Sequence, residues 1–361
     1  QRVRSDANTD LLVSANGGDL AISDLAFDGP GGFSVLNRGD VDGQTAGKGI
    51  FLDVREDQTG MVQLALTNVS VKGVANHGIH VSDCTLADDC GSGAGGAGGG
   101  SPASLHIQLE NVTVDGAGTG KFDADGLRAD ERGAGDIHLS ANGSEFARVG
   151  ADGLELDECQ AGSIHSTIIR TAFIDNGPYC NPDVLAEYMP AEPEGSFQDG
   201  MMQPSDIPSA VTGTPDDNCF EREVSLYDSG SVEEYEIGLD LDDGIDYDEA
   251  DSGNLNLTMI GSTVSGNYDE GVDMDEAGPG NGNLRYISTV AYGNSDDGFK
   301  MSEEDAGGVD GAVMGSVSRD NGGVGVVFEE ESDGNLVVQI SDVHTVNNDD
   351  SDDTGLEIVQ E

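Results

Sequence analysis

Apolar and polar residues alternate along much of this chain with a period of two. Val272 and Met274 alternate with Asp273 and Asp275, and the same pattern recurs at 245–248. Alternation of this kind is typical of β-strands that bury one face. A second apolar run follows each of these segments, and no long stretch has the spacing of an amphipathic helix. The pattern therefore predicts many short strands and no long helices.

An internal repeat indicates how these strands are arranged. Four segments align without gaps, and their anchor glycines are 27 residues apart: Gly244, Gly271, Gly298 and Gly325. Gly126 and Gly153 show the same step, Gly49 and Gly78 mark less regular copies, and Gly355 marks the last copy after a short slip. Short strands, glycine turns and a period in the twenties indicate a solenoid of parallel strands.

Two insertions interrupt the repeat within what we expect to be a single domain, 1–361. The first is a Gly-rich loop at 87–103. The second, at 178–241, holds seven of the ten prolines. Proline is disfavoured where strands need their backbone N–H groups for pairing, so the prolines mark a segment outside the coils.

Asparagines recur at one position of the repeat, four residues before the anchor glycine. They are Asn267, Asn294 and Asn321, with Asn348 after the slip and Asn176 one step beyond Gly153. Asparagine tolerates left-handed turns and hydrogen bonds to nearby backbone. Stacked in register, these side chains are expected to hydrogen bond to one another along the solenoid axis.

In this coil pattern the chain resembles the right-handed parallel β-helix superfamily, often called pectin-lyase-like. The resemblance covers nearly all residues outside the two insertions. It implies an all-β fold, a right-handed parallel β-helix solenoid with coils of 27 residues. It implies little about function, because one fold hosts many functions.

Acidic residues recur at fixed positions around the anchor glycines and would form columns on such a solenoid. Successive rungs lie about 4.8 Å apart, and like charges at that distance repel by about 0.9 kcal/mol in bulk water. Calcium accepts six to eight oxygens from flexible carboxylates, so we expect Ca²⁺ between the rungs, most densely from Asp246 to Glu276. The predicted ligands are Asp130, Glu131, Asp157, Glu158, Asp243, Asp246, Asp248, Glu249, Asp273, Asp275, Glu276 and Glu303.

The alternative is a solvated acidic face held in high salt. The GGxGxD repeat of calcium-binding β-rolls and the EF-hand loop are both absent from the sequence. The calcium prediction therefore depends on the columns alone.

The overall charge restricts the partners. Lys and Arg number 15 and Asp and Glu 70, a formal net charge of −55. So acidic a chain cannot assemble a basic surface for phosphates, which excludes nucleic acid. No apolar run is long enough for a transmembrane helix, so membrane insertion is not expected either.

Lys300 is the candidate catalytic residue. It replaces an acidic residue in one column, next to Asp273. In the polysaccharide lyases that share the resembled fold, a Lys or Arg beside a calcium-holding Asp cluster abstracts a sugar proton, and the resemblance implies that role for Lys300. The alternative is that Lys300 only relieves charge repulsion. Paired carboxylates also suit glycoside hydrolysis, but every rung has such a pair and none is singled out.

The five cysteines suggest disulfides. We expect a Cys84–Cys90 bond that closes a small loop, and a Cys180–Cys219 bond that staples the Pro-rich insertion. Cys159 is then left over, either buried and free or in place of one of these partners. Zinc bound by His77, His80, Cys84 and Cys90 is an alternative, because imidazole and thiolate ligands suit zinc. Disulfides imply an oxidising, extracellular setting.

Three functions follow as expectations. The first is a secreted calcium-binding protein of a cell surface or matrix, with a glycan as an expected ligand. The second is a calcium-dependent polysaccharide lyase that acts on a uronate glycan, and the third a self-assembling extracellular fibre subunit. Strand-like residues reach both ends of the sequence, so we expect either a longer natural chain, the favoured reading, or end-to-end stacking of subunits.

Overall fold

The fold is seen in a computed structural model. It describes residues 2–4, 11–37, 47–83, 100–189, 195–207, 218–332, 334–348 and 355–360. Strands account for nearly all of the regular structure, as the period-two pattern predicts.

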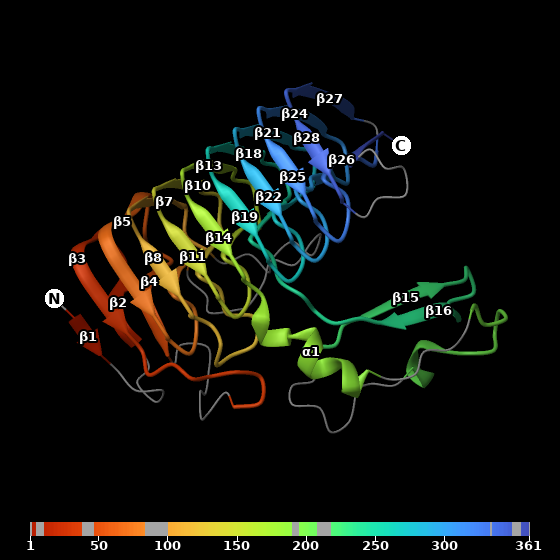
Figure 1. Cartoon of the computed structure of the whole chain (residues 1–361), viewed down its shortest axis with the longest axis horizontal. Coiled ribbons are helices and arrows are strands. Elements are labelled where there is room, and N and C mark those ends of the chain that lie inside the picture. Colours follow the sequence, from red (N-terminus) through yellow and green to blue (C-terminus); the bar gives the residue numbers. More distant parts are fainter. Residues whose placement is uncertain are drawn as a thin grey trace.

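Two long parallel sheets run side by side along the molecule (Figure 1). The ten-stranded sheet contains, in stacked order, β2 (Leu11–Asn16), β4 (Lys48–Val54), β6 (Ile79–Asp83), β9 (Leu127–Glu131), β12 (Leu154–Glu158), β17 (Ile245–Ala250), β20 (Asp273–Ala277), β23 (Ser302–Glu303), β26 (Val326–Glu330) and β29 (Leu356–Gln360).

The seventeen-stranded sheet combines two adjacent columns of strands. The longer strands are β3 (Leu20–Asp28), β5 (Gly60–Lys72), β7 (Ala103–Glu110), β10 (Ile137–Asn142), β13 (Ile164–Ile169), β18 (Leu255–Ile260), β21 (Asn281–Ile287), β24 (Gly308–Met314) and β27 (Asn335–Ser341). The short strands are β1 (Arg2–Arg4), β8 (Thr113–Asp115), β11 (Glu145–Ala147), β14 (Ala172–Ile174), β19 (Thr263–Ser265), β22 (Val290–Tyr292), β25 (Val317–Arg319) and β28 (His344–Val346).

Each coil visits the two sheets in turn. The chain runs from β17 through β18 and β19 to β20, and each strand pairs in parallel with its counterpart one coil later. A residue in the left-handed region bends the chain between the long and the short strand, for example Gly261 at φ 59° and Gly315 at φ 59°. The architecture is a parallel β-helix, and this part of the fold prediction is confirmed.

The core fills the inside of the coils. Inward-facing residues such as Leu156, Tyr247, Met274 and Phe299 are at most 1% exposed and belong to one continuous hydrophobic cluster. Burial of this area supplies the main stabilisation of a solenoid, since each coil covers the next.

The predicted asparagine ladder is present at a corner of the coils. Asn267 Nδ2 donates to Asn294 Oδ1 at 3.0 Å, and Asn294 Nδ2 donates to Asn321 Oδ1 at 3.0 Å. The ladder extends from Asn176 at one end to Asn348 at the other. Their backbone N–H groups donate along the same column, so the ladder satisfies buried groups that the turns leave unpaired.

The Pro-rich insertion extends away from the coils (Figure 1). Its described elements are η1 (Pro178–Cys180), α1 (Pro182–Leu185), η2 (Ala186–Tyr188), η3 (Pro204–Asp206) and the antiparallel hairpin of β15 (Arg222–Leu226) and β16 (Val232–Ile237). The predicted Cys180–Cys219 disulfide is present, and both cysteines pack in a small separate hydrophobic cluster with Tyr179 and Leu185.

The other cysteine predictions are only partly covered. Cys159 is disulfide-bonded, which fits the alternative that it replaces one of the expected partners and excludes a free cysteine. Cys84 and Cys90 lie outside the described residues, as does most of the Gly-rich insertion. Within the described ranges, no helix is long and apolar enough to cross a membrane.

Candidate metal centre

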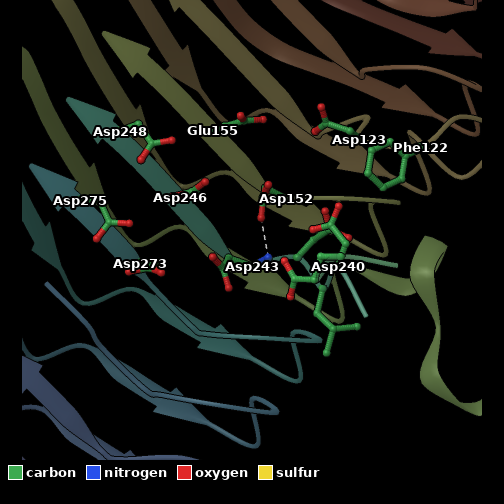
Figure 2. A pocket seen from close by; sticks show the side chains of 13 residues that line it. Phe122, Asp123, Asp152, Glu155, Asp240, Asp243, Asp246, Asp248, Asp273 and Asp275 are labelled. Atoms are coloured by element: carbon green, nitrogen blue, oxygen red, sulfur yellow. Dashed lines mark hydrogen bonds between the residues drawn. The ribbon is translucent and has the colours of Figure 1, made fainter. Parts of the chain in front are cut away.

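An acidic cavity of about 410 Å³ lies against the ten-stranded sheet (Figure 2). The strands β12, β17 and β20, and the turns before β9, β12 and β17, supply Asp123, Asp152, Glu155, Asp243, Asp246, Asp248, Asp273 and Asp275. The Pro-rich insertion supplies Glu221 and Asp240, and Asp242 follows directly after it. Only Phe122 and Leu241 among the lining residues are not acidic.

The register of the strands builds the floor of this cavity. Glu155 pairs with Asp246, and Asp246 with Asp273, along one column. Asp157, Asp248 and Asp275 form the second column in the same way. The repeat predicted both columns, with a step of 27 residues from β17 to β20 and with the Pro-rich insertion between β12 and β17. The structure confirms this alignment of the acidic residues.

A third column runs along the residues that precede the anchor glycines. Asp152 Oδ1 accepts the backbone N–H of Asp243 at 2.5 Å, the bond drawn in Figure 2, and Asp243 Oδ1 accepts that of Glu270 at 2.6 Å. These bonds fix the carboxyl groups in place and use one oxygen of each.

At one end of the acidic face the chain supplies its own cation, Arg128. This buried guanidinium lies 2.9 Å from Asp130 Oδ1, 2.9 Å from Asp157 Oδ2 and 3.1 Å from Glu155 Oε2. Asp123 and Asp125 also lie within ion-pair distance of it. The predicted metal ligands Asp130 and Asp157 therefore already contact a positive charge.

At the other end of the acidic face, Lys300 also supplies a positive charge to neighbouring carboxylates. Its Nζ lies 2.8 Å from Asp273 Oδ2 and 3.2 Å from Glu270 Oε1. Asp273 and Glu270 raise the pKa of Lys300 above its ordinary value, although burial opposes them. An ammonium held in this way is a poor general base, so the geometry favours the charge-relief interpretation of Lys300 over the lyase base.

Between these two ends, three carboxyl groups have no fixed counter-charge from the described part of the chain. Among the described residues, no basic side chain forms an ion pair with Asp152, Asp243 or Asp246. Burial raises the pKa of all three carboxyl groups well above the ordinary value, and neighbouring carboxylates raise it further. A cation placed among them would remove this penalty.

Two triads within the described chain have oxygens close enough to share one ion. Asp123, Asp125 and Glu155 form the first, and Asp243, Asp269 and Glu270 the second, with all ligand atoms of a triad within 4.8 Å. Arg128 forms ion pairs with all three carboxylates of the first triad. In the second, Lys300 reaches only Glu270, which leaves Asp243 and Asp269 to a metal ion.

The predicted glutamate ligands lie elsewhere, inside the solenoid. The strand alternation turns Glu131, Glu158, Glu249, Glu276 and Glu303 inward, and each is at most 1% exposed. They stack in register at the turn that leaves the ten-stranded sheet. The sequence grouped them with the outward aspartates, but the structure separates the two sets by the thickness of the strand.

Four of the five inward glutamates, all but Glu249, accept a backbone N–H of the turn that follows them. Glu276 Oε1 accepts the backbone N–H of Gly280 at 3.1 Å, and Glu131 Oε2 accepts that of Gly133 at 3.0 Å. The second oxygen, for example Glu276 Oε2 and Glu303 Oε2, has no donor within the described chain. Burial raises the pKa of Glu158 and of Glu276 to about 10, and the facing glutamates add to this. Facing carboxyl groups of this kind are joined only by a shared proton or a cation.

A sequence signal for this inward column exists. A glycine follows each glutamate by four residues, as in Glu249 with Gly253 and Glu276 with Gly280. A Cβ on Gly280 would lie 2.4 Å from Glu276 Oε1 and 2.0 Å from Gly253 O, so only glycine fits there. No sequence pattern predicts that Glu221, Asp240 and Asp242 line the cavity, because the insertion does not follow the 27-residue repeat.

The structure describes two of the four residues of the alternative zinc site, His77 and His80. His77 and His80 are buried with ring centroids 4.6 Å apart, and His80 Nε2 lies 2.6 Å from Asp130 Oδ2. His77 Nδ1 accepts the backbone N–H of Asp125, and His80 also contacts the buried Lys48. These histidines belong to a polar network next to Arg128. The sulfur ligands Cys84 and Cys90 lie outside the described residues.

Comparison of the chain with protein-family models, with curated proteins and with solved structures finds no match. The interpretation of the site therefore depends on its own geometry.

Proposed function

We propose that this protein binds divalent cations, Ca²⁺ in the first place, in the acidic cavity. The observation that carries the proposal is the distribution of charge. Carboxylates line the cavity, and Arg128 pairs with Glu155 at one end and Lys300 with Asp273 at the other. Within the described part of the chain no basic side chain pairs with Asp152, Asp243 or Asp246, so a proton or a mobile cation must balance these carboxylates.

The ligand chemistry favours calcium over other metals. The lining offers carboxylate oxygens and neither imidazole nor thiolate, and hard cations prefer oxygen. Calcium accepts six to eight ligands in irregular geometry, which fits carboxylates contributed by several coils and by the insertion. Magnesium demands a near-ideal octahedron and keeps more water.

Bound calcium would join parts of the chain that are far apart in sequence. Asp152, Asp243 and Asp273 come from three successive coils, and Asp240 from the insertion. An ion that binds only the folded state adds about 2.7 kcal/mol to the free energy of unfolding at a hundred times its Kd. We therefore propose a calcium-dependent structural role.

The finer proposal is a secreted protein of the pectin-lyase-like superfamily, acting at a cell surface or in a matrix. The Cys180–Cys219 disulfide fits an oxidising compartment. Asp246, Asp248 and Asp275 are partly exposed, so the cavity opens to solvent. A calcium ion held there can keep free coordination positions for the carboxylate or hydroxyl groups of a glycan.

The test compares calcium binding and thermal unfolding of metal-stripped protein at fixed ionic strength. The double variant Asp243→Asn/Asp246→Asn keeps the size and one oxygen of each side chain but removes the charge. We expect its calcium affinity to fall about tenfold or more, and the calcium-dependent rise in Tm to shrink with it.

The matched control is Glu56→Gln, a charge loss at an exposed residue away from the cavity. It should retain wild-type calcium affinity. A wild-type protein whose Tm is the same with millimolar calcium and with chelator would overturn the proposal. So would a double variant that binds calcium as tightly as the wild type.

A further inference from the structure

A second cavity, of about 610 Å³, lies at the corner of the coils that carries the asparagine ladder. This corner cavity shares no lining residue with the acidic cavity. Several coils and the start of the Pro-rich insertion contribute its side chains, which include Thr119, Arg148, Asp175, Pro178, Tyr268 and Ser295. Among the described residues that line it, only Arg148 and Asp175 are charged. Their formal charges cancel, so the corner cavity differs in its chemistry from the acidic cavity.

One residue from each of five coils builds the floor of the corner cavity. Each of them directly follows one of the paired short strands β8, β11, β14, β19 and β22: Gly116, Arg148, Asp175, Gly266 and Gly293. All five lie in the left-handed region, with φ between 53° and 67°. The three glycines leave the floor without side chains. The floor therefore runs along the solenoid for four steps of about 4.8 Å each.

Two charged residues in adjacent coils interrupt this glycine floor. The left-handed backbone at φ 53° strains Arg148, because that region favours glycine. Its side chain is 56% exposed and forms an ion pair with Asp115. Asp175 Oδ1 lies over Gly266, where a Cβ would approach it to 2.5 Å, so only glycine leaves room for this carboxylate. The floor thus presents a guanidinium and a carboxylate side by side to an open cavity.

The walls of the corner cavity add apolar surface and hydroxyl groups. Tyr268 and Pro178 supply the apolar faces, and Thr119 and Ser295 supply the hydroxyl groups. Tyr268 Oη accepts a hydrogen bond from Asn181 Nδ2 at 3.1 Å, which ties the aromatic ring to the Pro-rich insertion. The ring is therefore held beside the floor by a contact that needs no ligand.

These groups restrict the class of ligand. An anion is disfavoured, because the guanidinium of Arg148 is already paired and the carboxylate of Asp175 repels negative charge. A metal ion is disfavoured, because Asp175 is the only carboxylate among the described lining residues. A purely apolar ligand would cover the polar groups of the floor without offering them hydrogen bonds. A neutral molecule with many hydroxyl groups and an apolar C–H face suits both the floor and the ring.

We propose that the corner cavity binds a neutral saccharide chain. Asp175 accepts hydrogen bonds from neighbouring hydroxyl groups, and Arg148 donates to sugar oxygens, as paired and planar groups of this kind do. Tyr268 packs against the C–H face of a sugar ring. A floor that runs along five coils accommodates several sugar units in a row. This site does not depend on the calcium proposal, because it shares no residue with the acidic cavity.

The test begins with the full chain on an immobilised panel of neutral oligosaccharides built from glucose, galactose, mannose, xylose and N-acetylglucosamine. The panel member that binds best is then titrated by calorimetry in millimolar calcium and in chelator. We expect the same affinity in both buffers, because the carboxylates of the acidic cavity take no part. The variant Asp243→Asn/Asp246→Asn should bind the saccharide as the wild type does.

Arg148→Gly separates binding from folding. Glycine occupies this position in three of the neighbouring coils, so the variant relieves backbone strain and loses only an exposed ion pair. Its Tm should be unchanged or higher, while its saccharide affinity should fall about tenfold or more. The matched control is Arg170→Gly, which removes another left-handed arginine, at φ 48°, outside the corner cavity. This control should bind like the wild type.

Asp175→Asn tests the carboxylate in the same way, since asparagine also tolerates the left-handed region. We expect a loss of saccharide affinity of similar size, about tenfold. Full affinity in either Arg148→Gly or Asp175→Asn would overturn the proposal, as would a wild-type chain that binds no member of the panel at millimolar concentration. Binding that chelator abolishes would also overturn it, because the saccharide would then belong to the acidic cavity.

Discussion

Two basic residues, Arg128 and Lys300, replace carboxylates in the acidic columns of the ten-stranded sheet. In the sequence each looks like an exception at a position where other coils carry Asp or Glu. In the structure Arg128 contacts five carboxyl groups and Lys300 contacts two. These residues act as permanent counter-ions, and they flank the part of the face where we propose that a mobile cation binds.

Arg128 is expected to be the more important of the two for stability. Arg128→Met leaves five carboxyl groups around a buried apolar side chain. Breaking a buried ion pair by removing one partner costs about 3–5 kcal/mol, and we expect a loss of that size in denaturant unfolding. The exposed Arg170→Met, which removes a hydrogen bond to Asn142, should cost under about 1 kcal/mol. Equal losses in the two variants would contradict this role.

Lys300→Met separates the two interpretations of Lys300. If the ammonium is a counter-ion, its removal frees Glu270 and Asp273 for a metal ion. The variant should then have a lower Tm without calcium and an unchanged or higher calcium affinity in calorimetry. If Lys300 is a lyase base, wild-type protein should release unsaturated products from a panel of uronate glycans, and Lys300→Met should not.

At the scale of the elements, the repeat step predicted most of the site. Because the coils keep one step, the sequence alone places Asp246 opposite Asp273 and Asp248 opposite Asp275. Strand alternation also predicts that the side chain of Glu276 points inward, because the neighbouring Asp275 points outward. The sequence prediction of one shared metal site for the two residues overlooked this alternation. The walls contributed by Glu221 and Asp240 could not be predicted, since no periodicity relates the insertion to the coils.

The asparagine ladder should couple neighbouring coils. Asn294 accepts from the backbone and the side chain of Asn267 and donates to Asn321, all within the buried corner. Asn294→Ala leaves these groups without partners, which costs about 1–3 kcal/mol for each one that water cannot reach. We expect a clear loss of stability in denaturant unfolding, against little change for the exposed Asn37→Ala. A neutral Asn294→Ala would show that the ladder does not contribute to stability.

For the whole molecule, the buried carboxyl groups predict an unusual pH dependence. The pKa of Glu158 and of Glu276 is raised to about 10, and that of Glu131 and Asp275 to about 8, with burial as the largest cause in each. The folded state therefore binds more protons than the unfolded state above the ordinary carboxyl range. The free energy of unfolding must then fall as the pH rises through these values.

Metal-stripped protein should accordingly unfold at a lower temperature near pH 9 than near pH 5. Calcium should raise the Tm more at the higher pH, because the carboxylates are then ionised and bind the ion without losing a proton. The measurement is a series of thermal unfolding curves with and without calcium at constant ionic strength. A Tm of the stripped protein that is constant or rises with pH would contradict the prediction.

The most direct test of the calcium site is an anomalous difference map from crystals grown in millimolar calcium. The proposed function predicts peaks in the cavity between Arg128 and Lys300, near Asp152, Asp243 and Asp246, each with six to eight oxygens at about 2.3–2.6 Å. A map with no peak there, while the carboxylates keep the positions described above, would contradict it.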